Sequence, residues 1–203
     1  MISEAYNMDC MEYMKSLPDN AFDLAIVDPP YGLPKDSSNG RGKLKGRAFN
    51  QGHIATWDVK PSSEYFEELF RVSHNQIIWG GNYFGLPATR CVLVWDKVQP
   101  WENFSQVEIA WTNFDSPAKL FKFDNRTGSK IHPTQKPVAL YRWIFQHYAK
   151  DGDKILDTHL GSGSSRIAAY EAGLDFVGCE IDKEYFDKQE ERFQAFTDQL
   201  RLF

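Results

Sequence analysis

The sequence predicts a single α/β domain built on an open, mostly parallel β-sheet. Segments that read as strands around an apolar centre, such as 22–27, 154–157 and 176–180, alternate along the chain with amphipathic segments of helix length. That alternation is typical of parallel sheets whose strands are connected by helices. The 203 residues fit one domain, 1–203, and we find no internal repeat.

Composition excludes several other classes of protein. Hydrophobic residues make up 42% of the chain and charged residues 25%, which is typical of a globular domain and not of a disordered one. No stretch approaches the roughly 18 apolar residues of a membrane span, and the N-terminus lacks a basic segment followed by an apolar one. Cys10, Cys91 and Cys179 form no Cys-x-x-Cys pair. We therefore expect a cytoplasmic protein with reduced thiols and no membrane segment.

The first 111 residues predict two helices and five strands. One helix follows Asn7-Met8-Asp9 and ends at Pro18. The other begins at Pro61 and carries a core face with the i, i+3, i+4 spacing of Phe66, Leu69 and Phe70. The expected strands are 2–6, 22–27, 76–79, 90–95 and 107–111.

The C-terminal part alternates more regularly. A helix opens at Lys136-Pro137-Val138, with proline at its favoured first position. A strand at 154–157 runs into a glycine loop, and the helix after that loop stops at Gly173. The last strand and the last helix are expected at 176–180 and 183–200.

Two segments have little periodicity. Residues 33–56 predict a flexible basic loop, which is either a solvated face or a clamp on phosphates. Residues 112–130 predict either a short target-recognition insert or a surface hairpin. Because the net charge is −5, contact with nucleic acid must be local. The candidate DNA-binding residues of the two segments are Lys35, Arg41, Lys43, Lys45, Arg47, Lys119, Lys122 and Arg126.

The strand at 22–27 stops at Asp28-Pro29-Pro30-Tyr31-Gly32. The prolines remove two backbone donors, so the loop offers carbonyl acceptors that have no ladder partners. Asp28 adds a carboxylate, and Tyr31 adds a flat ring. Acceptors beside a ring suit the exocyclic amine of a base extruded from a duplex. The alternative is a proline-rich strand end whose aspartate caps a turn.

The stretch Asp157-x-x-x-Gly161-x-Gly163 lies between a strand and a helix, and the next strand ends at Glu180. Glycines allow a ligand to approach the backbone, and an acid at that strand end can accept both ribose hydroxyls. The loop lacks the third glycine and the lysine of phosphate-binding loops. An adenosine-containing cofactor therefore fits better than ATP or a dinucleotide, and a structural tight turn is the alternative.

These motifs, in this order, resemble those of the DNA amino-methyltransferases of the beta class, in which Asp-Pro-Pro-Tyr precedes the cofactor motif. The resemblance covers Asp28–Gly32, the strands up to Trp111, and the segments 132–137, 157–165 and 178–185. It implies a Rossmann-like sheet of seven strands, the last antiparallel, with helices on both faces. It also implies S-adenosyl-L-methionine as cofactor and double-stranded DNA as partner. Family members are often homodimers.

The resemblance also implies roles for individual residues. Asp28, Pro29, Pro30 and Tyr31 would be catalytic, with Tyr31 stacked on the flipped base. Thr134 and Lys136 would hold the methionine carboxylate, and Asp9 would lie near the adenine amine or simply cap the first helix. The full implied cofactor set is Asp9, Asp28, Thr134, Lys136, Asp157, Gly161, Ser162, Gly163 and Glu180.

One departure from the family pattern stands out. Thr158-His159 replaces the usual Pro-Phe, and we expect His159 to be a substituted packing residue. The motif begins with aspartate, which by analogy favours a site-specific adenine-N6 methyltransferase. Cytosine-N4 transfer and a binding module without turnover remain alternatives. The five histidines form no ligand cluster, so no metal site is expected.

Overall fold

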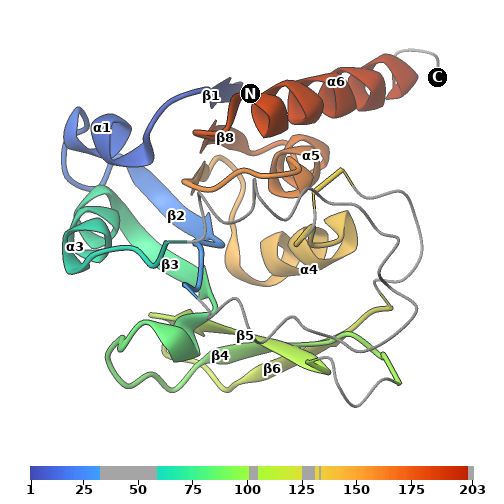
Figure 1. The fold of residues 1–203 in the computed structure, drawn as a ribbon. Helices are drawn as coiled ribbons and strands as arrows, with labels where there is room; N and C mark the ends of the chain where they lie inside the picture. The colour runs from blue at the N-terminus through green and yellow to red at the C-terminus, as the bar shows by residue number, and fades with distance from the viewer. Residues whose placement is uncertain (33–58, 101–104, 125–130, 133, 201–203) are drawn as a thin grey trace.

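The computed structural model describes residues 1–32, 59–100, 105–124, 131–132 and 134–200. Its centre is an eight-stranded sheet in the order β1-β8-β7-β2-β3-β5-β4-β6 (Figure 1). The strands are β1 (Ser3–Tyr6), β2 (Phe22–Val27), β3 (Ser73–Trp79), β4 (Val92–Asp96), β5 (Val107–Thr112), β6 (Lys119–Lys122), β7 (Lys154–Asp157) and β8 (Asp175–Cys179). The helices are α1 (Cys10–Lys15), α3 (Ser63–Val72), α4 (Val138–Tyr148), α5 (Ser164–Glu171) and α6 (Lys183–Leu200), with a 3-10 turn η3 (Gly81–Tyr83).

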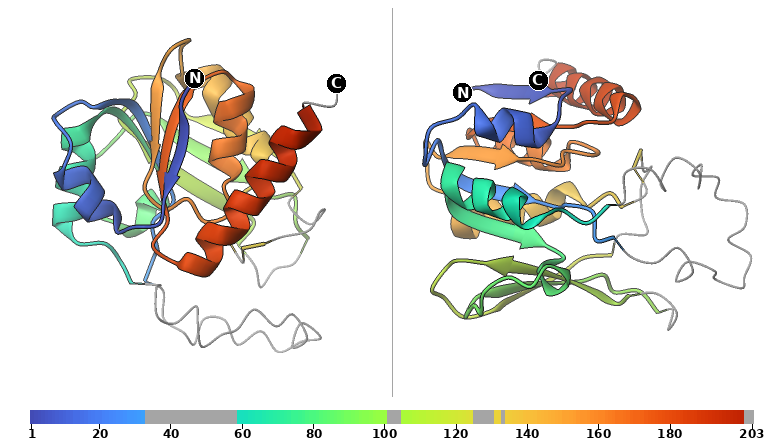
Figure 2. Two further views of the ribbon diagram at one scale, coloured as in Figure 1. Left: turned by 90° about the horizontal axis from the view of Figure 1, so that it is seen from above. Right: turned by 60° about the vertical axis from the view of Figure 1, so that its left-hand side comes forward.

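Helices cover both faces of the sheet, as expected. Leu140 and Ile144 of α4 pack with Ala168 of α5 on one face. Met14 of α1 and Leu69 of α3 pack on the other. Figure 2 shows these two layers edge-on, with α1 and α3 on one side of the strands and α4, α5 and α6 on the other. Strand β2 is buried along nearly its whole length because both of its faces are covered.

The sheet is mostly parallel, and it has one strand more than the seven expected. Among the described strands only β5 runs antiparallel, and it lies between β3 and β4 instead of being the last in the chain. The additional strand is β6, which pairs in parallel with β4. Residues 119–122 of the segment 112–130, for which a recognition insert and a surface hairpin were both open, thus form an edge strand of the main sheet. A four-residue edge strand is too short to give a recognisable alternation in the sequence.

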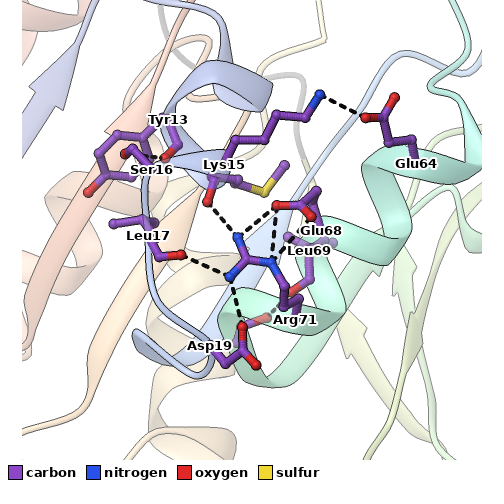
Figure 3. Close-up of polar contacts among 11 residues, drawn as sticks. Tyr13, Lys15, Ser16, Leu17, Asp19, Glu64, Glu68, Leu69 and Arg71 are labelled. Carbon is purple, nitrogen blue, oxygen red and sulfur yellow. Dashed lines mark hydrogen bonds and ion pairs between the residues drawn. The ribbon is translucent and has the colours of Figure 1, made fainter.

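Arg71 fixes α1 beside α3. Its guanidinium donates to the carbonyls of Met14 and Leu17, each at 2.8 Å, and pairs with Glu68 and Asp19 (Figure 3). Met14 is in the last turn of α1 and Leu17 follows the helix, so Arg71 adds donors to carbonyls at the point where the helical hydrogen bonds end. This clamp holds α1, and with it the candidate site residue Asp9 at the start of α1.

Two further expectations concern the environment of the protein. No helix in the described part of the chain is long and apolar enough to cross a membrane. Cys10, Cys91 and Cys179 are all free thiols.

Candidate active site at the carboxyl ends of the strands

One cavity of about 610 Å³ lies where β2, β7 and β8 end. Ligands of open α/β sheets bind at this edge, and the volume suits a small molecule. The segments that line it come from both ends of the chain, so the early Asp-Pro-Pro-Tyr loop and the late glycine loop share one site. The predicted residues that line it are Asp9, Asp28, Pro29, Pro30, Tyr31, Thr134, Lys136, Gly161, Ser162 and Glu180.

Tyr31 is held in place by contacts on several sides. Its hydroxyl donates to Asp28 Oδ1 at 2.8 Å, and its ring stacks on Tyr83 with centroids 5.0 Å apart. Burial, followed by the charge of Asp28, raises the pKa of Tyr31, so the hydroxyl stays protonated. A side chain at Gly80 would come within 2.2 Å of the Tyr31 ring. The glycine turn after β3 thus leaves the space that Tyr31 fills.

Lys136 is buried between two carboxylates. Its side chain is 2% exposed, and its Nζ forms ion pairs with Asp28 Oδ2 and, at 3.1 Å, with Glu108 Oε2. Burial favours the neutral amine, but Asp28 and Glu108 outweigh it, so the pKa of Lys136 is raised. The resemblance assigned Lys136 to the methionine carboxylate. The structure places its ammonium on carboxylates of the chain itself.

Glu108 is a site residue that the sequence analysis missed. It lies on β5, lines the cavity and also pairs with Lys97 at 2.5 Å. Burial opposes its ionisation, yet Lys136 and Lys97 leave the pKa of Glu108 lowered. In the sequence it is only one polar residue of an alternating strand. No motif marks it, so only the pairing of β5 with β3 and β4 could reveal its role.

Glu180 shapes the glycine loop and faces the cavity. Its Oε2 accepts the N–H of Gly161 at 2.8 Å, and its Oε1 accepts the N–H of Asp182 at 2.9 Å. Burial raises the pKa of Glu180, and these hydrogen bonds oppose that shift. Each carboxylate oxygen retains a second lone pair, so Glu180 can still accept the hydroxyls of a bound ribose.

Asp157 and Gly163 belong to the frame of the loop and do not line the cavity. Asp157 is buried and accepts hydrogen bonds from Ser165 Oγ at 2.6 Å and from the His159 N–H at 3.0 Å. Burial raises its pKa to about 7. Gly163 has φ +71° and caps the start of α5, where a Cβ would lie 3.1 Å from Gln189 Oε1.

Asp9 is a helix cap and a cavity residue at once. Its Oδ1 accepts the N–H of Met11 at 2.7 Å, which confirms the N-cap expected of it, and it also lines the cavity. On the other side of the cavity, Thr134 Oγ1 lies 3.1 Å from His132 Nδ1, and the His132 ring packs on Tyr185.

His159 also lines the cavity, where the sequence predicted a packing residue. Its Nδ1 lies 2.9 Å from Thr158 Oγ1, which in turn lies 2.6 Å from the Tyr65 hydroxyl. The replacement of Pro-Phe by Thr158-His159 thus introduces a chain of hydrogen bonds into the wall of the site.

The predicted DNA-binding residues are only partly placed. Lys119 and Lys122 lie on β6 at the edge of the sheet and do not line the cavity. Lys122 Nζ lies 3.9 Å from Asp96. Within the described ranges no group of three or more His, Cys, Asp or Glu residues could hold a metal ion. The other candidates lie outside the described residues: Lys35, Arg41, Lys43, Lys45, Arg47 and Arg126.

Comparison with known proteins identifies the family. The family model described as DNA methylase, of the N6/N4 type, matches residues 74–191, more than half of the chain. The chain therefore belongs to the N6/N4 DNA methylases. The type II methyltransferase M.HpaI of Haemophilus parainfluenzae is 26% identical over 238 residues, covering 92% of this chain and 73% of that protein.

Solved structures share the fold. The M1.HpyAVI–SAM complex matches with a TM-score of 0.64 at 22% identity, over 95% of this chain and all of that one (100%). The cytosine-N4-specific PvuII DNA methyltransferase matches with a TM-score of 0.63 at 15% identity, over 98% and 92% of the two chains. The expected Rossmann-like methyltransferase fold is confirmed.

Proposed function

We propose that this N6/N4 DNA methylase transfers a methyl group to the exocyclic N6 amine of an adenine flipped out of double-stranded DNA. The observation that carries the proposal is that Asp28 and the prolines after it share one cavity with Gly161 and Glu180. An acceptor site for an amine and a site for an adenosine-containing cofactor thus adjoin each other. The close approach of amine and methyl donor is what a direct displacement requires.

The cofactor is S-adenosylmethionine, as bound in the M1.HpyAVI complex. The residues present fit it: Glu180 has free lone pairs for ribose hydroxyls, and Gly161 has φ +53°, a conformation that favours glycine, so no side chain projects from the loop at this point. When bound, the cofactor supplies an electrophilic methyl group on a sulfonium. We assign it to Asp9, Thr134, Gly161, Ser162 and Glu180, which line the cavity. Asp157 and Gly163 support their loop.

Asp28 and the Pro29 carbonyl would accept the two hydrogens of the target amine. The lone pair of that amine is delocalised into the base, so acceptors that favour a tetrahedral nitrogen and its growing positive charge assist transfer. Tyr31 and Lys136 already hold the two oxygens of Asp28 and leave each a second lone pair. The acceptor is therefore oriented before the base arrives. Tyr31 lines the same cavity, where its ring would stack on the flipped base.

We propose adenine and not cytosine as the target base because the motif begins with aspartate, by analogy with the family. The fold does not decide between them, since the PvuII enzyme, whose specificity is cytosine-N4, matches this chain with a TM-score of 0.63. Cytosine-N4 transfer is therefore the second candidate.

Target recognition belongs to the basic segments in this proposal. Contacts to phosphates by 33–56, and recognition within 112–130, would fix the position of the duplex over the cavity. The whole chain then forms one methyltransferase domain, and it would act as a homodimer if a second copy helps to read the target.

Nucleoside analysis tests the proposal. The protein is incubated with methyl-labelled S-adenosylmethionine and unmethylated genomic DNA, and the digested nucleosides are separated by mass spectrometry. We expect the label in N6-methyladenine. Label in N4-methylcytosine would contradict the choice of base. Cofactor binding without any label in DNA would support the binding module. RNA and a protein extract serve as control substrates and should remain unlabelled.

A further inference from the structure

We propose that His159 is a specificity-determining residue for the cofactor: its Nε2–H donates a hydrogen bond to a ring nitrogen of the cofactor's adenine. Tyr65 and Thr158 act as positioning residues that fix the tautomer of His159. The identity of the cofactor rests on the proposed function. The inference itself concerns a residue that departs from the family pattern.

The first observation is a chain of three polar groups leading from α3 to the cavity. The Tyr65 hydroxyl lies 2.6 Å from Thr158 Oγ1, and Thr158 Oγ1 lies 2.9 Å from His159 Nδ1. Tyr65 and Thr158 are each 3% exposed, and the rings of Tyr65 and His159 meet edge-on at 5.4 Å. The His159 ring is therefore fixed both by packing and by a bond at Nδ1.

The direction of these bonds follows from satisfying the buried hydroxyls. If Tyr65 donates to Thr158, then Thr158 donates to Nδ1, and every hydroxyl proton has an acceptor. If His159 Nδ1–H instead donated to Thr158 and Thr158 donated to Tyr65, the Tyr65 proton would have no acceptor among the described residues. An unpaired buried donor is costly. Nδ1 is thus an acceptor, so the proton of the neutral ring lies on Nε2.

Two further features support a neutral ring with a free donor. Burial lowers the pKa of His159 to about 4, so the ring is uncharged near pH 7. No polar atom within the described ranges hydrogen-bonds to its Nε2, and His159 lines the cavity. A phenylalanine at this position would fill the same wall without offering a donor.

The cavity also presents a matching acceptor. Asp9 lines it as well, and its carboxylate opposes the lowering of the His159 pKa by burial. One Asp9 oxygen caps α1, and the other makes no hydrogen bond to the described residues. An acceptor and a donor that line one cavity complement adenine, whose amine donates hydrogens beside ring nitrogens that accept them.

Calorimetric titration with S-adenosylhomocysteine and its 1-deaza, 3-deaza and 7-deaza analogues tests the inference without requiring methyl transfer. We expect His159→Phe to weaken S-adenosylhomocysteine binding by about tenfold, and Tyr65→Phe to weaken it less. One deaza analogue should bind the wild type about tenfold more weakly, and His159→Phe should not distinguish it from the parent compound. His147→Phe, a change of an exposed histidine on α4, is the matched control and should bind like the wild type.

Equal binding of S-adenosylhomocysteine by the wild type and His159→Phe would overturn the inference, as would equal losses for every deaza analogue in both proteins. Absence of binding by the wild type would instead contradict the proposed function. Nitrogen-15 NMR of the wild-type imidazoles provides a readout that does not depend on a variant folding. We expect His159 to carry its proton on Nε2 at pH 7, and a proton on Nδ1 would overturn the assignment.

Discussion

Asp28 is the central residue of the proposed site, and it has a protein donor on each carboxylate oxygen. Tyr31 supplies one, and the buried ammonium of Lys136 supplies the other. Glu108 balances the charge of Lys136 from the opposite side. A buried cation needs such partners, because an unpaired charge in a protein interior is strongly destabilising. Asp28, Lys136 and Glu108 therefore act as one unit.

Lys136→Met should separate the two roles open to Lys136. If Lys136 positions Asp28, methyl transfer should fall by roughly 10²-fold or more, the typical cost of losing a group that orients a transition-state contact. The affinity for S-adenosylhomocysteine should change less than about threefold, well under 1.4 kcal/mol. Loss of cofactor binding would instead make Lys136 the ligand of the methionine carboxylate. Thermal melting confirms folding, and Glu108→Gln, which keeps the cation on Asp28, should cost less activity.

Asp157 should make the stability of the free protein depend on pH. Burial raises its pKa to about 7 in the folded state, against about 3.9 when unfolded. The folded state therefore holds the proton longer, so this stabilisation is complete below about pH 4 and is lost as the pH rises to 7. The full effect is on the order of 4 kcal/mol at most. Urea unfolding at pH 5 and pH 8 should show a smaller pH dependence for Asp157→Asn, and an unchanged dependence would contradict this account.

At the scale of elements, the turn between β3 and η3 positions the aromatic part of the site. Gly80 has φ +70°, and the ring of Tyr31 occupies the space where its side chain would lie. Gly81 likewise leaves room for Trp111, whose Cβ lies 2.3 Å from the position of an added Cβ. The two glycines therefore allow β3, β5 and the loop after β2 to approach closely.

Gly80→Ala and Gly85→Ala form a matched pair. Both glycines have positive φ, at +70° and +64°, but nothing lies within 4 Å of an added Cβ at Gly85. Gly85→Ala should lower the free energy of unfolding only by the cost of placing alanine at a positive φ, about 1–2 kcal/mol. Gly80→Ala should cost a further 1–3 kcal/mol or so and reduce methyl transfer, because Tyr31 must move. Urea unfolding and initial rates measure both effects. Equal losses of unfolding free energy and of initial rate in the two variants would show that the contact between Gly80 and Tyr31 is unimportant.

The sequence predicted best those elements in which apolar residues form a run or recur at helical spacing over many residues. Strand β2 has four consecutive apolar residues, Leu24 to Val27, and α6 carries apolar residues at helical spacing near both of its ends. Strand β6 was missed because four residues cannot establish a period. The function of the Asp-Pro-Pro-Tyr loop could be predicted from the chemistry of its own residues. Glu108 did not, because its importance comes from Lys136, which only the folded chain brings beside it.

For the molecule as a whole, the cavity joins two loops that are far apart in the chain. Asp28 follows β2 and Gly161 follows β7, and these strands are neighbours in the sheet. The sequence motifs could predict each of the two loops separately. Their common cavity follows from the parallel pairing of β2 with β7, which places the carboxyl ends of both strands at the same edge. In the function proposed above, the closeness of the two loops would bring the methyl donor and the target amine together.

The central claim is that Asp28 accepts the target amine and is not needed to hold the cofactor. It is tested most directly by single-turnover methyl transfer and S-adenosylhomocysteine titration of Asp28→Ala, with the exposed Asp115→Asn as control. We predict that Asp28→Ala forms less N6-methyladenine by roughly 10²–10³-fold or more, while cofactor affinity stays within about threefold of the wild type. Near-normal transfer by Asp28→Ala, or loss of its cofactor binding, would contradict the account.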